Sequence, residues 1–92
     1  MISLEDYAQW LKSHGYSDRT PNGGPSTVQD YAGRVRRVAE SERLNIQNFA
    51  KKINIMVWDY SPDGCKASEG MKSHHAVYSA LKLFQEYVND QK

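Results

Sequence analysis

The sequence predicts an all-α fold, in which a single domain of 92 residues forms a compact orthogonal bundle of four or five helices. Apolar residues recur at spacings of three and four along most of the chain, which is the pattern of helices with one buried face. Residues that cap helices precede these segments, and prolines and glycines separate them. A domain of this length buries roughly two-thirds of its unfolded surface, so we expect a self-sufficient core.

A first helix is predicted from Leu4 to His14. The Ser3 hydroxyl can cap this helix, and Asp6 in its first turn favours the positive end of the helix dipole. Gly15 suits the left-handed conformation with which many helices end. The apolar face comprises Leu4, Tyr7, Ala8 and Leu11, with Trp10 beside it.

A loop and a second helix follow. The loop from Ser17 to Pro25 contains two prolines and a pair of glycines, which interrupt helices. Ser26 opens a capping box with Gln29, and the helix is predicted from Thr27 to about Ser41. Its apolar face comprises Val28, Tyr31, Ala32, Val35, Val38 and Ala39. Gly33 lies away from this face, which fits either a close approach by a phosphate or another chain, or a tolerated glycine.

A third helix is predicted from Ile46 to Tyr60, with Asn45 as its cap. Its apolar positions are Ile46, Phe49, Ile53, Met56, Val57 and Tyr60. The β-branched residues at positions 53, 55 and 57 alternate in a way that also fits a strand. We favour a helix, because no second segment offers a strand with which this one would pair.

The last helix is predicted from Ser73 to Asn89. Before it, Ser61 to Gly64 has the composition of a turn, and Cys65 to Lys72 is predicted to be a polar connector. The apolar face of the helix comprises Val77, Ala80, Leu81, Phe84, Tyr87 and Val88. Lys72, His75 and Lys82 lie across from that face, so one side packs and the other presents charge to a partner.

The composition is nearly balanced in charge, with a formal net charge of +1, so nucleic-acid binding would have to come from local clusters of basic residues. The lone Cys65 cannot form an internal disulfide. Met1 to Trp10 does not resemble a signal peptide, and no apolar run reaches the roughly 20 residues that span a bilayer. We therefore expect a soluble, cytoplasmic protein without membrane contacts.

Several short segments occur in an order that is typical of one family. These are Trp10-Leu11 at the end of the first helix, Ser26-Thr27-Val28 with Tyr31, and Ser79 to Phe84 with Tyr87 and Val88. In this order the chain resembles, over nearly its whole length, the SAM-like core-binding N-terminal domain of the tyrosine recombinases, or phage integrases. The resemblance implies a SAM-like bundle that clamps one side of duplex DNA while a separate catalytic domain closes from the other side.

In that family, basic and polar side chains of the second and fourth helices contact phosphates and the major groove. The residues of this chain that the resemblance places there are Thr27, Arg34, Arg36, Arg37, Lys72, Ser73, His75, Ser79 and Lys82. The planar fork of arginine donates two parallel hydrogen bonds to phosphate, and the first turn of a helix attracts anions. However, Glu40 and Glu42 lie among the arginines, and a mixture of both charges is also ordinary for a solvated helix.

No catalytic residue, cofactor or metal site is predicted. The chain lacks the arginine, histidine and tyrosine constellation of a recombinase, so DNA integration and recombination chemistry would reside elsewhere and this chain is expected not to be an enzyme. His14, Cys65, His74 and His75 do not have the spacing of a zinc site. The expected partners are duplex DNA, a C-terminal catalytic domain and other copies of the chain.

A competing interpretation is a SAM-like module for protein interaction, which associates with itself or with another chain. The near-neutral charge favours it. Trp58 and Tyr16 do not fit the apolar faces, so each is either a residue at the edge of the core or an anchor for a protein partner.

Overall fold

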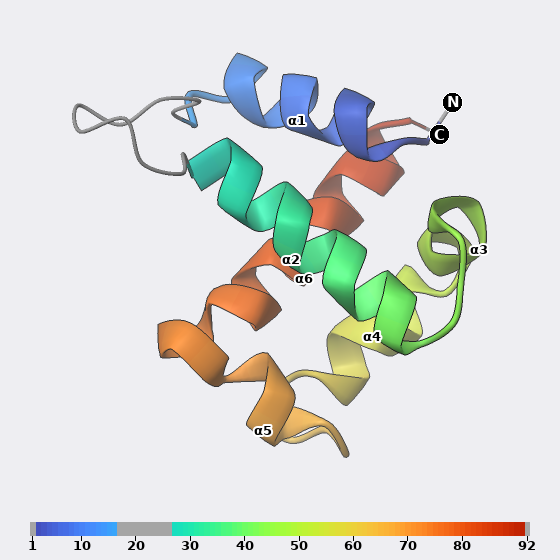
Figure 1. Ribbon diagram of the computed structural model, residues 1–92, viewed down its shortest axis with the longest axis vertical. Helices are drawn as coiled ribbons and strands as arrows, with labels where there is room; N and C mark the ends of the chain where they lie inside the picture. Colours follow the sequence, from blue (N-terminus) through green and yellow to red (C-terminus); the bar gives the residue numbers. More distant parts are fainter. Residues whose placement is uncertain (1, 17–26, 92) are drawn as a thin grey trace.

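Helices make up all of the regular structure in the residues that the computed structural model describes, which are 2–16 and 27–91, with the backbone alone at 72–75. They are α1 (Leu4–Ser13), α2 (Thr27–Ser41), α3 (Ile46–Lys51), α4 (Ile53–Asp59), α5 (Ala67–Gly70) and α6 (Lys72–Asp90) (Figure 1). No strand occurs within those ranges, so the predicted all-α class is confirmed. The predicted number of helices, four or five, is too low.

The first helix begins and ends as its sequence predicts. The Ser3 hydroxyl accepts a hydrogen bond from the amide of Asp6 at 3.0 Å. At the other end Gly15 has a φ of 91°, and the amide of Tyr16 donates to the carbonyl of Leu11 at 3.0 Å. This left-handed ending turns the chain so that the ring of Tyr16 lies 6.3 Å from that of Tyr31 on α2.

The bounds of α2 agree with the predicted helix, and Gly33 meets no neighbouring atom within 4 Å of where a Cβ would be. This helix also ends in a left-handed residue, Arg43, with a φ of 58°. The amide of Leu44 then donates to the carbonyl of Ala39 at 3.0 Å. Two sequence predictions, the loop from Ser17 to Pro25 and the capping box opened by Ser26, lie outside the described residues.

The predicted third helix is wrong in one respect, because it divides into α3 and α4 at Lys52. Asn45 caps α3 as expected, accepting from the amide of Asn48 at 2.8 Å. Lys52 then leaves the helical conformation, with φ −104° and ψ 12°. No glycine or proline stands there, so the bend follows from packing: α3 contacts α2, whereas α4 lies along α6. The weak helix formers Ile53, Asn54 and Ile55 just after the bend give it little resistance.

The predicted polar connector is also wrong, because it contains the short helix α5 and folds back over the end of α4. The amide of Lys66 donates to the carbonyl of Asp59 at 2.7 Å. Gly70 lies so close to Tyr60 that a Cβ would be 2.8 Å from the carbonyl carbon of Tyr60 and closer still to its oxygen. Only glycine fits such an approach between two backbones.

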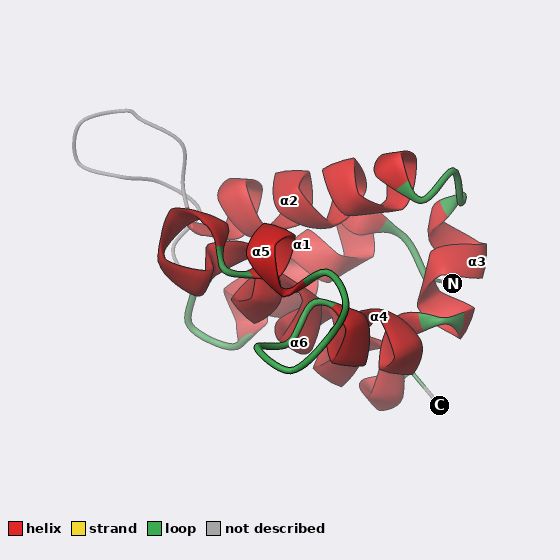
Figure 2. Ribbon diagram, turned by 90° about the horizontal axis from the view of Figure 1, so that it is seen from below, coloured by secondary structure: helices red, strands yellow, loops and turns green. Residues whose placement is uncertain are grey.

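The core lies between α6 and the helices that cover it. In Figure 2, α2 and α6 lie on opposite sides of the molecule and face each other across the core. The largest fully buried side chains are Tyr7, Leu11, Val28, Val35, Phe49, Leu81, Phe84 and Tyr87. The predicted apolar face of the last helix is confirmed, since five of its six residues are buried and Val77 is partly buried. No helix in the described part of the chain has both the length and the apolar content to cross a bilayer.

Three hydrogen bonds connect the first helix and its cap to the last helix. The Tyr7 hydroxyl donates to the carbonyl of Ala80 at 3.0 Å inside the core. The amide of Ser3 donates to the Tyr87 hydroxyl at 3.2 Å, and Trp10 Nε1 donates to Asp90 Oδ2 at 2.7 Å. These bonds close the bundle by joining segments that are far apart in the sequence.

Candidate functional site

An open hollow of about 720 Å³ lies beside the C-terminal half of α2, facing the segment that follows α4. We call it the α2 groove. It is lined by Arg34, Arg37, Val38, Ser41, Glu42, Tyr60, Lys66, Glu69 and Val77. Cationic side chains thus reach it from α2 and from the segment before α5, and two carboxylates accompany them. Groups of both charges at an open apolar surface are suited to binding a polar ligand.

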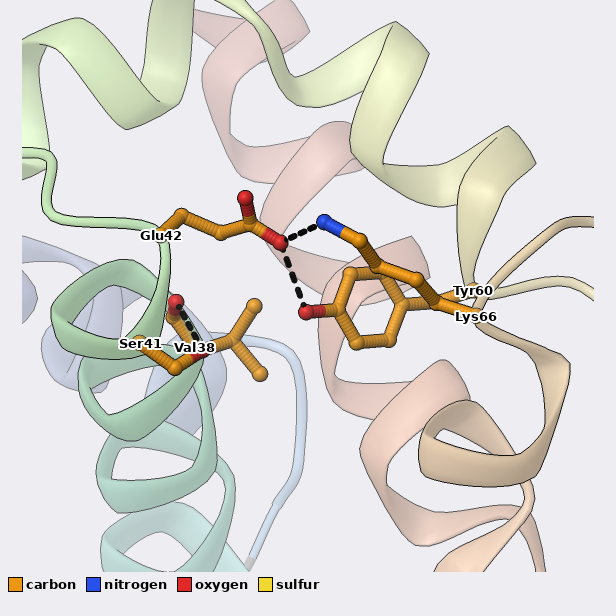
Figure 3. Close-up of polar contacts among 5 residues, drawn as sticks. All are labelled: Val38, Ser41, Glu42, Tyr60 and Lys66. Carbon is orange, nitrogen blue, oxygen red and sulfur yellow. Dashed lines mark hydrogen bonds and ion pairs between the residues drawn. The ribbon is translucent and has the colours of Figure 1, made fainter.

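Glu42, Tyr60 and Lys66 form a hydrogen-bond network at one end of the groove (Figure 3). Glu42 Oε1 accepts from the Tyr60 hydroxyl at 2.9 Å and also from Lys66 Nζ. The ammonium of Lys66 lies 5.6 Å from the centroid of the Tyr60 ring, a favourable cation–π distance. The network joins the end of α2 to the end of α4 and holds the charge of Lys66 in the groove.

The network shifts the pKa values of its members in the directions expected of an ion pair. The hydrogen bond from Lys66 is the main cause that lowers the pKa of Glu42, and the bond from Tyr60 adds to it. The same contact with Glu42 raises the pKa of Lys66. Burial, followed by the bond to Glu42, raises the pKa of Tyr60. All three therefore keep their ordinary charge states at neutral pH.

The network should make stability depend on pH below neutrality. Because the pKa of Glu42 is lower in the folded chain, its contribution is complete above the ordinary pKa of 4.5 and is lost as pH falls through the lowered value. We expect Glu42→Gln to reduce the melting temperature at neutral pH and to reduce it less near pH 2, because the contribution of the carboxylate is lost as pH falls through its lowered pKa. Thermal unfolding followed by circular dichroism at both pH values measures this difference.

Glu40→Gln is the matched control, because Glu40 is exposed and lies 3.8 Å from Arg36 in a surface pair. Such pairs contribute little to stability. If Glu42→Gln lowered the melting temperature equally at both pH values, the carboxylate charge would have no role in stability.

The predicted DNA-binding residues of α2 do not form one surface. Arg34 is largely covered, and its Nε donates to Asp30 Oδ2 at 2.9 Å. Arg37 is exposed and lines the groove with Arg34. Arg36 lies about 100° around the helix from Arg37, outside the groove. Thr27 is exposed at the first residue of α2.

The predicted residues of α6 lie elsewhere. Lys82 is exposed, with Nζ 5.5 Å from the centroid of the Tyr78 ring, and Ser79 is partly buried on the same side of the helix. Because α2 and α6 pack through their buried faces, the exposed side chains of Arg37 and Lys82 lie on the outer faces of the two helices. The side chains of Lys72, Ser73 and His75 lie outside the described residues. The structure therefore brings together Arg34 and Arg37, but neither Ser79 nor Lys82 lines their groove.

The sequence pattern did not indicate that Lys66, Glu42 and Tyr60 belong to one site. Lys66 stands in the supposed connector, and Tyr60 was assigned to an apolar face. One signal was present in the sequence, because a buried tyrosine hydroxyl usually has a polar partner. Nothing in the sequence indicated which partner that would be.

Among the candidate metal ligands with described side chains, neither Cys65 nor His14 lines the groove. Cys65 is an exposed thiol. The ring of His14 stacks on that of Trp10 at 4.0 Å, and His14 Nδ1 lies 2.8 Å from the carbonyl oxygen of Trp10. Within the described side chains, no group of three or more His, Cys, Asp or Glu residues is placed to hold a metal ion.

The chemistry available in the groove is the binding of anionic oxygens by guanidinium and ammonium groups. Comparison of the chain with models of known protein families, with curated proteins and with solved structures gave no match. A function must therefore be inferred from the chain's own side chains.

Proposed function

We propose that this chain is a DNA-binding module, like the recombinase domain that its sequence resembles, and that it contacts the phosphate backbone of duplex DNA through the α2 groove. The proposal includes a SAM-like arrangement of the helices, with strand cleavage and joining carried out by another domain. The observation that carries it is the convergence of Arg34, Arg37 and Lys66 on one open groove.

Arg37 is the principal contact in this proposal. Its side chain is exposed and makes no ion pair or hydrogen bond within the residues that the structure describes, so its fork is available to a phosphate. Arg34 and Lys66 are held in place by Asp30 and Glu42. Cations that are already ordered lose less side-chain entropy when they bind a ligand.

The first turn of α6 supports the same function. Val77 of α6 lines the groove, and the helix begins about one and a half turns earlier, at Lys72. The unpaired amides and the dipole of a helix N-terminus favour a negatively charged group. A phosphate bound by Arg37 and a second phosphate near this turn would orient the DNA backbone along the groove.

A fluorescence-anisotropy titration with labelled duplex DNA tests this function. We expect affinity to fall linearly with salt on a logarithmic scale, because binding releases counterions from the phosphates. Arg37→Ala should weaken binding to every duplex alike and reduce the salt slope by about 1. Glu42→Gln should act in the opposite direction, because it removes a negative charge from the groove and releases the ammonium of Lys66.

Lys82→Ala is the matched control, since it removes one exposed cation that does not line the α2 groove. We expect it to change binding much less than Arg37→Ala. Absence of binding at low salt would exclude DNA as the ligand. A loss with Lys82→Ala but not with Arg37→Ala would instead assign the contact to the outer face of α6.

A further inference from the structure

An exposed apolar pair stands on α4, on the face that points away from the core. Ile55 is 58% exposed and Trp58 is 62% exposed. The two residues are one helical turn apart and share a face, while Ile53, Met56 and Tyr60 are buried on the other side. An exposed tryptophan beside an exposed isoleucine concentrates binding energy at one place on the surface. Neither residue lines the α2 groove.

Opposite charges stand at the two ends of this face. Lys52 is exposed at the start of α4, and Asp59 is the last residue of the helix. At about 100° per residue these positions differ by only about 20°, so both lie along one edge of the face. Along the helix axis, the midpoint between Lys52 and Asp59 lies about 1.5 Å from the midpoint between Ile55 and Trp58. The charged pair and the apolar pair are therefore centred on nearly the same point of the helix. Neither charged side chain lies within ion-pair distance of an opposite charge in the described residues, and their longer-range partners are Glu42 for Lys52 and Lys66 for Asp59.

We propose that α4 is the contact surface of a symmetric homodimer, in which the α4 helices of two copies pack antiparallel. A two-fold axis through the middle of the helix sets Lys52 of each copy against Asp59 of the other. It also sets Trp58 of each copy against Ile55 of the other. In a two-fold interface every contact occurs twice, so a single helix with this charge pattern is complementary to itself.

The dimer should be weak. The helix has seven residues, and two such helices bury less than the roughly 1,200 Å² that stable complexes bury. Small interfaces of this kind support transient association. We therefore expect dimers at the upper end of the micromolar range, and monomers in dilute solution.

Sedimentation equilibrium of the full chain between about 10 µM and 1 mM tests the proposal. The weight-average mass of the wild type should rise toward twice the monomer mass, and Trp58→Ala should abolish the rise. Lys52→Asp and Asp59→Lys each bring like charges together twice in a dimer, so each should weaken association by about tenfold or more. Lys12→Asp alters the net charge as Lys52→Asp does, but on α1, which packs mainly against α2 and α6, and should leave the association unchanged.

The decisive sample is an equimolar mixture of Lys52→Asp and Asp59→Lys. In a dimer with one copy of each variant, both charge contacts join opposite charges again, so the mixture should associate more strongly than either variant alone. Circular dichroism checks that every variant is folded. A wild type that stays monomeric to about 1 mM overturns the proposal, as does a mixture no more associated than its components. Arg37→Ala should not affect dimerisation, so this result and the DNA titration stand or fall separately.

Discussion

Phe84→Ala should lower the free energy of unfolding by roughly 3–5 kcal/mol, which is the largest effect we expect from any single substitution in this chain. The Phe84 side chain is 0% exposed and lies at the centre of the aromatic core. Its ring meets that of Tyr7 edge-on, with centroids 5.1 Å apart, and the rings of Tyr87 and Phe49 lie at 5.7 Å and 5.9 Å. Truncation to alanine removes all three ring contacts and leaves a cavity between α1, α3 and α6.

Urea unfolding followed by far-ultraviolet circular dichroism measures the loss. Since domains are stable by only about 5–15 kcal/mol, Phe84→Ala can leave the chain partly unfolded in water. Phe84→Leu keeps most of the apolar volume, and we expect it to fold with a smaller loss. Lys82→Ala, in the same helix but exposed, should change stability by less than about 0.5 kcal/mol. If Lys82→Ala were as destabilising as Phe84→Ala, the buried face of α6 would be wrongly assigned.

Gly70→Ala should lower the free energy of unfolding by about 3 kcal/mol, although it adds a single methyl group. That methyl group would lie 2.8 Å from the carbonyl carbon of Tyr60 and closer to its oxygen, and both are backbone atoms that cannot rotate away. The chain must then move α5 away from the end of α4. Such a movement also disturbs the segment that carries Lys66 into the groove.

Gly33→Ala is the matched comparison, because the same change is made in a helix where a Cβ meets no atom within 4 Å. Alanine is the better helix former, so this variant should be more stable than the wild type by about 0.5–1 kcal/mol. Urea unfolding of both variants measures the contrast. A neutral Gly70→Ala would mean that α5 does not pack against α4, whereas a destabilising Gly33→Ala would point to a contact at Gly33 outside the described residues.

Local signals predicted the helix ends well. Ser3 and Asn45 each accept a hydrogen bond from the amide three residues further on, so the residues that define each cap are close in the sequence. Gly15 likewise indicates a left-handed backbone, because a glycine has no Cβ to oppose it. Such features need no knowledge of the rest of the molecule, which is why the two ends of α1 and the start of α3 agree with the sequence prediction.

The division at Lys52 and the helix α5 could not be predicted in this way. The apolar face of the predicted third helix continues without a break through position 52, and only the different packing partners of α3 and α4 cause the bend. The four residues of α5 make a single turn, which is too short to show a period. Both features arise from tertiary contacts.

The candidate site was predicted in part. Arg34, Arg36 and Arg37 are close in the sequence and were predicted to bind DNA together, yet helical geometry separates Arg36 from the other two. Lys66 completes the groove, and it is 24 residues away from its partner Glu42. The composition of a sequence does not show which residues 24 positions apart lie together in space. Lys66 and Glu42 meet because the chain folds back over the end of α4.

The hydrogen bonds between α1 and α6 also bear on the order in which the chain is synthesised and folds. The partners are separated by 73, 80 and 84 residues, so α1 leaves the ribosome long before the helix that holds it. An isolated helix of ten residues is only marginally stable in water. At translation rates of about 5–20 residues per second, α1 waits roughly 4–16 s for Tyr87. During that interval the Tyr7 ring lacks its neighbours on α6, and the nascent chain offers an apolar surface that a chaperone can bind.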